Sequence, residues 1–247
     1  MTPGFVIDSF PERARHHRAT HAIVAVDVFR ASTTIVTALA GGRRVFAASS
    51  VGQALTIAAS LPGAWLAGEQ DGVQPEGFDL QNSPAAVALL PDRRPLVLVS
   101  SAGTLLLDMA AGAAAVYVAC LRNLGATARR VTAHHRRVAL IGAGTRGETR
   151  DEDRMACAWL GQHLLSMGFT AEDAATAAEV EAWRGAELAG LRAGASAEYL
   201  RSTGQDDDVD YVLGHVEDVS EAAVVDGGEV RLVRAAAPGS REPREAA

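Results

Sequence analysis

The sequence predicts an α/β fold, a three-layer α/β/α arrangement with a mostly parallel central sheet. Short runs of β-branched and other apolar residues alternate with Ala- and Leu-rich stretches of helical length, which is typical of a parallel sheet covered by helices on both faces. The chain has 247 residues, 48% of them hydrophobic, enough to bury a large core. We therefore expect a single domain over residues 1–235, followed by a disordered tail at 236–247.

The first strand of the predicted sheet is residues 21–28, which are apolar on both alternating faces until Asp27. This pattern indicates a buried central strand with a polar residue at its carboxyl end. Ser32 then offers an N-cap to a helix that ends at Gly41 and Gly42. The pattern next predicts a strand at 45–48, a helix at 51–61 and a short strand at 65–67.

Residues 68–84 are rich in Gly, Pro, Asp and Asn and are predicted to form a long loop, a feature that is often functional in compact domains. Beyond it, the predicted elements are strands at 96–100, 115–119 and 138–141 and helices at 105–111 and 151–167. From about residue 171 to 201 the chain is predicted to be helical. An acidic stretch at 206–210 follows, then a short hairpin around Asp226-Gly227-Gly228.

The charge and residue usage exclude several classes of protein. Thirty acidic residues against 23 basic ones give a net charge of −7, which disfavours a nucleic-acid partner. The chain contains no Lys, so a Walker-type phosphate loop and Schiff-base chemistry are excluded. Cys120 and Cys157 are too few for a disulfide framework. No secretory signal or membrane segment is visible, so we expect a cytoplasmic protein, with enough apolar surface for a homodimer.

The most informative polar turn follows the first predicted strand. It places the Asp27 carboxylate at the strand end, Arg30 three residues later and the hydroxyls of Ser32 and Thr33 at a helix start. Such a group can hold a divalent cation and an anionic oxygen group, because ligands of open α/β sheets bind where strand ends meet helix N-termini. The alternative is structural: a capped turn with Arg30 paired at the surface.

Three further polar segments are predicted to reach the same edge of the sheet. The loop at 68–84 supplies oxygen ligands, and the turn at 100–104 combines small residues with backbone N–H groups that open a helix. A third segment contributes Glu152 and Asp153 near the mouth of a later strand. Most loop acids are simply solvated, and acids in a first helical turn also serve as caps, so only part of this set is expected to be functional.

The turn Gly142-Ala-Gly-Thr-Arg-Gly147 matches the spacing of a dinucleotide-binding loop. It lies late in the chain, and nearby carboxylates would repel a pyrophosphate. A dinucleotide-dependent oxidoreductase is therefore the least favoured of the functions considered. No Gly-x-Ser-x-Gly elbow is present, which leaves serine hydrolysis without support.

Five segments carry a resemblance to a known family: DVFRASTTIVTAL (27–39), GEQDGVQPEGFDLQNSP (68–84), SSAGT (100–104), CLRN (120–123) and the Glu152-Asp153 pair. Together they resemble the 2-phosphosulfolactate phosphatases of coenzyme M biosynthesis. The resemblance implies a Mg²⁺-dependent phosphoric monoester hydrolase that acts on a small anionic phosphorylated acid. The chain departs from the family pattern at three positions. Gln70, Gln81 and Ala102 stand where Arg, Gly and Asn, respectively, are common in the family.

The resemblance also implies roles for individual residues. Asp27, Arg30, Ser32 and Thr33 would form the catalytic phosphate end, and Asp27, Glu152 and Asp153 would hold the metal. The substrate-binding set would be Glu69, Asp79, Asn82, Ser101, Gly103, Thr104 and Asn123. We favour attack by water over a phosphoaspartyl intermediate on Asp27, because Phe29 stands where haloacid-dehalogenase-like phosphatases have a second Asp. A non-catalytic binder of a small organic anion on the same fold is the main alternative.

Overall fold

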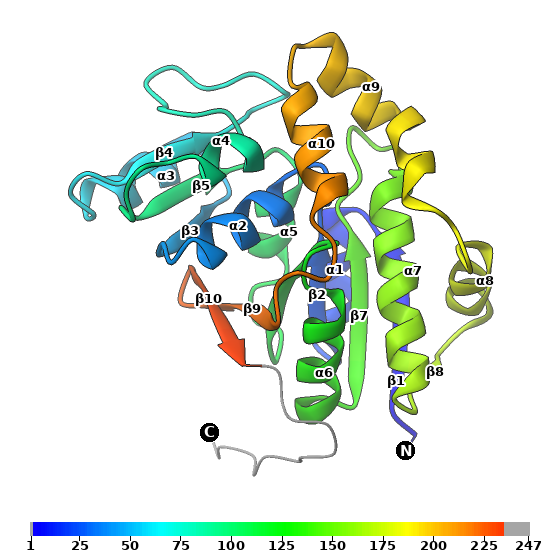
Figure 1. Cartoon of the computed structure of the whole chain (residues 1–247). Coiled ribbons are helices and arrows are strands. Elements are labelled where there is room, and N and C mark those ends of the chain that lie inside the picture. Colours follow the sequence, from blue (N-terminus) through cyan, green and yellow to red (C-terminus); the bar gives the residue numbers. More distant parts are fainter. Residues whose placement is uncertain (1, 235–247) are drawn as a thin grey trace.

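The computed structural model describes residues 2–234, which form one ten-stranded sheet flanked by helices (Figure 1). The strands are β1 (Gly4–Ser9), β2 (Ala22–Val26), β3 (Val45–Ala48), β4 (Trp65–Gly68), β5 (Leu96–Val99), β6 (Val116–Ala119), β7 (Arg137–Gly142), β8 (Thr170–Ala171), β9 (Glu221–Asp226) and β10 (Glu229–Arg234). The helices are α1 (Pro11–His17), α2 (Ala31–Ala40), α3 (Val51–Ala59), α4 (Pro84–Ala88), α5 (Gly103–Met109), α6 (Leu124–His134), α7 (Asp151–Ser166), α8 (Ala174–Ala182), the 3₁₀ helix η1 (Leu188–Ala193), α9 (Ala195–Ser202) and α10 (Asp206–Gly214).

The sheet consists of two parallel groups joined by the C-terminal hairpin. Its strand order is β4-β5-β3-β10-β9-β6-β2-β7-β1-β8. The pairs within β4-β5-β3 and within β6-β2-β7-β1-β8 are all parallel. The hairpin β9–β10 pairs antiparallel with β6 on one side and β3 on the other. In Figure 1 the twist of the sheet carries β4 and β5 across the direction of β7.

Alternation along the strands directs side chains into helical layers on both faces. In β2, Ile23 and Ala25 pack into the core formed with α1, α2 and α5, whereas Val24 and Val26 pack toward α6 and α7. In β5, Val97 and Val99 pack toward α3 instead. This follows from the period of two in a strand. The predicted α/β fold with a mostly parallel sheet and helices on both faces is therefore confirmed.

Helix α2 is the most deeply enclosed helix of the site region. Nine of its ten residues are buried, from Ala31 to Leu39. It packs against α4 and α5 and also against strands of both parallel groups. A helix buried on all sides, with its hydroxyl groups bonded within the protein, lies inside a core rather than on the surface. The N-terminus of α2, which follows Asp27, is consequently fixed by packing from several directions.

Some elements were not assigned from the sequence. Strand β1, helix α1 and helix α6 were missed, and the acidic stretch at 206–210 forms the first half of α10. Asp206, Asp207 and Asp208 all lie in the first turn of α10, where acidic groups interact favourably with the helix dipole. The tail at 236–247 lies outside the described residues, and the domain boundaries and the homodimer stay predictions. Between residues 2 and 234, no helix is long and apolar enough to cross a bilayer.

Candidate active site

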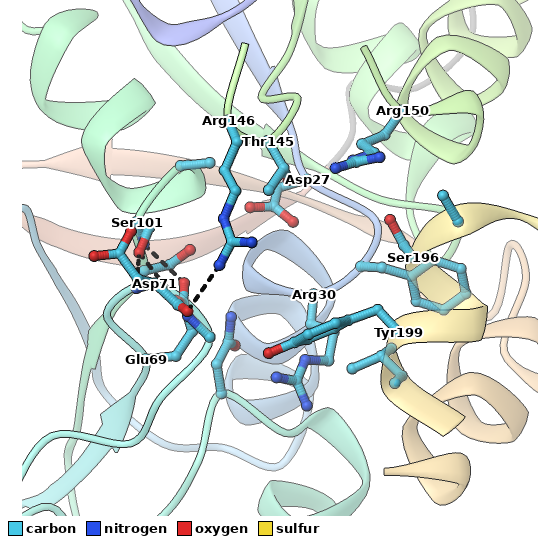
Figure 2. Close-up of a pocket in the computed structure, with 17 residues that line it drawn as sticks. Asp27, Arg30, Glu69, Asp71, Ser101, Thr145, Arg146, Arg150, Ser196 and Tyr199 are labelled. Atoms are coloured by element: carbon cyan, nitrogen blue, oxygen red, sulfur yellow. Dashed lines mark hydrogen bonds between the residues drawn. The ribbon is translucent and has the colours of Figure 1, made fainter. Parts of the chain in front are cut away.

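A cavity of about 420 Å³ lies where the loops that follow β2, β4, β5 and β7 meet α9 (Figure 2). Its lining residues are Asp27, Phe29, Arg30, Glu69, Asp71, Gly72, Asn82, Ser100, Ser101, Ala102, Thr145, Arg146, Arg150, Ala195, Ser196, Tyr199 and Leu200. Five of the predicted site residues are among them: Asp27, Arg30, Glu69, Asn82 and Ser101. The edge of the sheet expected to bind a ligand is therefore the edge that carries the cavity.

Asp27 stands just past the end of β2, at the N-terminus of α2. Its side chain is only 6% exposed. Oδ1 accepts a hydrogen bond from the Ala31 backbone N–H at 3.1 Å. A Cβ atom at Gly103 would lie 2.4 Å from Oδ2, so the absence of a side chain at position 103 makes room for this carboxylate. Asp27 thus lies at the helix N-terminus that was predicted to form the phosphate end of the site.

Burial raises the pKa of Asp27 to about 7, and the nearby carboxylates of Glu69 and Glu152 act in the same direction. Burial also raises the pKa of Asp153 well above its usual value, with further contributions from Asp27 and Glu152. The pKa of Glu152 is raised, again mainly by burial. These acids form a buried group whose charges repel one another, which is the electrostatic condition that a bound cation relieves.

Arg30 lines the cavity, but its charge is already paired. Nη1 lies 2.5 Å from Oδ2 of Asp208 on α10, and both side chains are almost fully buried. Oδ1 of Asp208 also accepts hydrogen bonds from Ser83 Oγ and from the Ala85 backbone N–H at the start of α4. Asp208 therefore connects three helices beside the cavity. From the sequence, Asp208 was recognisable only as part of an acidic stretch, and this role was not predicted.

The long loop after β4 is attached to the turn after β5 through Glu69. Its carboxylate accepts hydrogen bonds from the Ser101 backbone N–H at 2.8 Å, from Ser101 Oγ at 3.0 Å and from the Gly72 backbone N–H at 2.7 Å. Asn82, at the other end of the loop, accepts a hydrogen bond from Thr34 Oγ1 at 2.8 Å. These contacts fix the loop against the strand ends, so it is an ordered wall of the cavity.

The cavity has two walls of opposite charge. The carboxylate wall consists of Asp27, Glu69 and Asp71, and the arginine wall consists of Arg146 and Arg150 with the hydroxyl groups of Thr145, Ser196 and Tyr199. In Figure 2 the side chains of Arg146 and Arg150 extend into the cavity from the turn between β7 and α7. The arginine wall was not predicted from the sequence. The available signal was a run of polar residues after a strand end, which also matched a dinucleotide-binding loop and contained several acids.

Five of the predicted site residues do not line the cavity and instead bond to nearby backbone. They are Ser32, Thr33, Asp79, Thr104 and Asn123. The hydroxyl of Ser32 accepts from the Asp27 N–H, and that of Thr33 donates to the Val28 carbonyl. Thr104 and Asn123 similarly bond the backbone of the turns that precede α5 and α6. Asp79 is exposed and accepts from the Leu66 N–H. These side chains stabilise the turns rather than face a ligand.

The two acids proposed from α7 are buried behind the cavity wall. Asp153 accepts hydrogen bonds from the Val28 N–H at 2.8 Å and the Gly144 N–H at 3.1 Å, while Glu152 bonds to Ser196. Among residues 2–234, no three His, Cys, Asp or Glu side chains are arranged to hold a metal ion. The donor chemistry nevertheless fits Mg²⁺, which is usually held by one or two carboxylates together with water and substrate phosphate oxygens.

An α/β scaffold with buried carboxylates and arginines around a small cavity at its strand ends defines an enzyme-type site for a small anionic molecule. Comparison with known proteins identifies the family. Residues 8–221 match the family model described as 2-phosphosulpholactate phosphatase. The chain belongs to this family, which is one of phosphoric monoester hydrolases, and the predicted resemblance is confirmed.

Curated relatives support the same assignment. A probable 2-phosphosulfolactate phosphatase of Synechococcus sp. (strain CC9605) is 38% identical over 173 residues, covering 66% of this chain and 70% of the relative. One from Synechococcus sp. (strain RCC307) is 33% identical over 215 residues, 80% of this chain and 86% of the relative. One from Deinococcus radiodurans is 33% identical over 195 residues, 76% of this chain and 81% of the relative.

Proposed function

We propose that this chain is a Mg²⁺-dependent phosphatase that hydrolyses 2-phosphosulfolactate to sulfolactate and phosphate. The observation that carries the proposal is Asp27, a buried carboxylate that lines the cavity at the end of β2 in a chain of this family. Keeping this acid buried among other acids disfavours the folded state, and such unfavourable groups are commonly retained at functional sites.

Asp27 and Glu69, the two acids of the predicted set that line the cavity, are proposed to hold the metal, and the buried Glu152 adds negative charge behind them. Mg²⁺ bound there supplies positive charge to neutralise the phosphate oxygens in the transition state. Asp153 supports this group, because its two oxygens accept backbone N–H groups from both flanking turns and so fix the position of the Asp27 segment. Arg30 lines the cavity with its Nη1 held by Asp208, and its remaining N–H donors are proposed to bind phosphate oxygens.

The bond changes are those of phosphate monoester hydrolysis. The oxygen of a water molecule forms a bond to phosphorus, the bond from phosphorus to the ester oxygen breaks, and that oxygen takes up a proton. Catalysis of this step depends mainly on positioning and on charge neutralisation. We favour water over Asp27 as the nucleophile. The stereochemical course with a substrate that is chiral at phosphorus tests this choice, because inversion indicates direct attack by water and retention would support the covalent route through Asp27.

Phosphate release from a panel of phosphorylated hydroxy acids, with Mg²⁺ and with a chelator, tests the proposed function. We expect the fastest release from 2-phosphosulfolactate and loss of turnover with the chelator. No release from any member of the panel, together with Mg²⁺-independent stabilisation by the same compounds, would instead indicate a non-catalytic anion binder. We further propose that the reaction takes place in the cytoplasm and serves coenzyme M biosynthesis; the free, buried thiols of Cys120 and Cys157 are compatible with a reducing compartment.

A further inference from the structure

The two arginines of the arginine wall have little protein contact for their charge. Within residues 2–234, Arg146 forms no ion pair, and Nη2 makes its one hydrogen bond, to the Asp71 carbonyl oxygen at 3.1 Å. Arg150 approaches Glu148 at 3.3 Å, and that Glu148 side chain is 72% exposed. A guanidinium has five N–H donors, so both side chains keep most of their donors available to a ligand. Arg30 differs, because its partner Asp208 is buried.

The segment of the lining that carries these arginines is basic. Among the described lining residues from 145 to 200, Arg146 and Arg150 are the charged ones, and the other members are Thr, Ala, Ser, Tyr and Leu. The acids of the lining belong to the carboxylate wall, which Arg146 meets at the Asp71 carbonyl, and the buried Glu152 lies outside the lining close enough to Arg150 to interact with its charge. An anionic group of a ligand is therefore stabilised directly at the arginine wall, whereas near Asp27 and Glu69 it is repelled unless a cation lies between them.

We propose that Arg146 and Arg150 form a subsite for a second acid group of the substrate, a sulfonate or carboxylate carried on the same small molecule as the phosphate. This inference rests on the proposed function for the position of the phosphate, which lies toward Asp27. The planar fork of an arginine pairs with two oxygens of such a group at once. The arginine wall then selects phosphate esters that bear a second strong acid over simple alkyl phosphates.

The geometry of the turn supports this assignment. Arg146 has a φ of 52°, in the left-handed region, between Gly144 and Gly147, whose φ values are also positive. The Thr145 N–H bonds to the Glu148 carbonyl and the Glu148 N–H bonds to the Thr145 carbonyl, which closes the turn. The turn is therefore defined by its own backbone hydrogen bonds, and Arg146 projects from its tip into the cavity (Figure 2). This conformation, rather than a dinucleotide-binding loop, explains its glycine spacing.

Substrate selectivity tests the subsite. We would measure kcat/KM with Mg²⁺ for 2-phosphosulfolactate and for isopropyl phosphate, which lacks both other acid groups. For Arg146→Gln we expect kcat/KM on 2-phosphosulfolactate to fall roughly 30-fold and that on isopropyl phosphate to change less than about threefold, since a charge-assisted pair strengthens only the acid-bearing substrate. Arg146→Lys should recover part of the loss. Arg184→Gln removes the same charge from an exposed pair with Glu181 and should leave both values unchanged.

A binding measurement separates this inference from the proposed function. Calorimetry with 3-sulfopropionate, which has no phosphate, should show binding to the wild-type protein that weakens about tenfold or more in Arg146→Gln and in Arg150→Gln. Equal affinity in the wild type and both variants would overturn the subsite, as would an equal loss of kcat/KM on both phosphate esters, which would place the arginines at the phosphate. Should the wild type hydrolyse no phosphate ester, the proposed function fails, and the calorimetry still decides the subsite.

Discussion

The carboxylate wall and the arginine wall face the same cavity but are stabilised in different ways. Asp27 and Glu69 accept hydrogen bonds from backbone N–H groups, which fix their positions relative to the sheet. Arg146 has one hydrogen bond within the described chain, and the partner of Arg150 is exposed. A wall of fixed acids suits a group that must be positioned accurately, such as a metal and the phosphate beside it. A wall of free donors suits recognition of an anion that arrives with the substrate.

The largest expected loss of activity comes from a substitution in the carboxylate wall. Asp27→Asn should lower kcat/KM for the phosphate ester by at least about 10³-fold, because it removes the central negative charge while keeping an oxygen for the Ala31 N–H. Steady-state phosphate release measures this. Asp79→Asn is the matched control, since Asp79 is exposed and outside the cavity, and it should retain activity within about threefold. Near-wild-type activity in Asp27→Asn would remove the basis for the proposed site.

The next prediction tests whether Arg30, like Asp27 and Glu69, is held in place by contacts within the protein. Asp208→Asn should lower the free energy of unfolding by about 3 kcal/mol, because it leaves the buried Arg30 guanidinium without a counter-charge. Urea denaturation gives the value. Asp210→Asn, on the same helix, breaks an exposed pair with Arg192 and should cost less than about 1 kcal/mol. If the two variants proved equally stable, the buried Arg30–Asp208 pair would not stabilise the fold beside the cavity.

A third variant tests how tightly the carboxylate wall is packed. Gly103→Ala places a methyl group where Asp27 Oδ2 would be 2.4 Å away and the Ala31 Cβ 2.6 Å away, so the carboxylate must move. We expect kcat/KM to fall roughly 10- to 100-fold through this displacement. Gly52→Ala is its control, since nothing lies within 4 Å of an added Cβ there. Unchanged turnover in Gly103→Ala would show that Asp27 tolerates repositioning, contrary to the comparison of the two walls.

The carboxylate wall could be predicted from the sequence and the arginine wall could not, for physical reasons. Asp27 ends an apolar strand run and precedes a helix cap, so local pattern alone places it at the ligand-binding edge. The loop from Gly68 to Pro84 is recognisable by composition. Arg146 and Tyr199, however, reach the cavity only because β7 lies next to β2 and α9 folds back over the strand ends. Long-range pairing of that kind leaves no local periodicity to detect.

The order of strands in the sheet also depends on long-range pairing that local sequence patterns do not reveal. The alternation of strands and helices and the turn at Gly227-Gly228 follow from local composition. Nothing in β9 or β10 indicates that the hairpin lies between β6 and β3 in the middle of the sheet. Likewise, the short hydroxyl residues at the start of α2 look like ligand donors, yet Ser32 and Thr33 bond to backbone groups of their own turn. Sequence locates polar residues at the strand ends, but packing decides which of them face the cavity.

The smallest expected effect is a pH-dependent gain in the stability of Asp27→Asn over the wild type. The folded-state pKa of Asp27 is about 7, above the ordinary value of 3.8, so its contribution to stability is present below pH 4 and is lost as the pH rises through 7. In metal-free buffer, Asp27→Asn should therefore be more stable than the wild type at pH 8, by on the order of 1–2 kcal/mol, with the difference growing between pH 4 and 7. Thermal unfolding at several pH values measures this, with Asp79→Asn again as the control. A variant less stable than the wild type at pH 8 would mean that burial and the neighbouring acids do not disfavour the charged form of Asp27, and the electrostatic argument for a cation at the carboxylate wall would be lost.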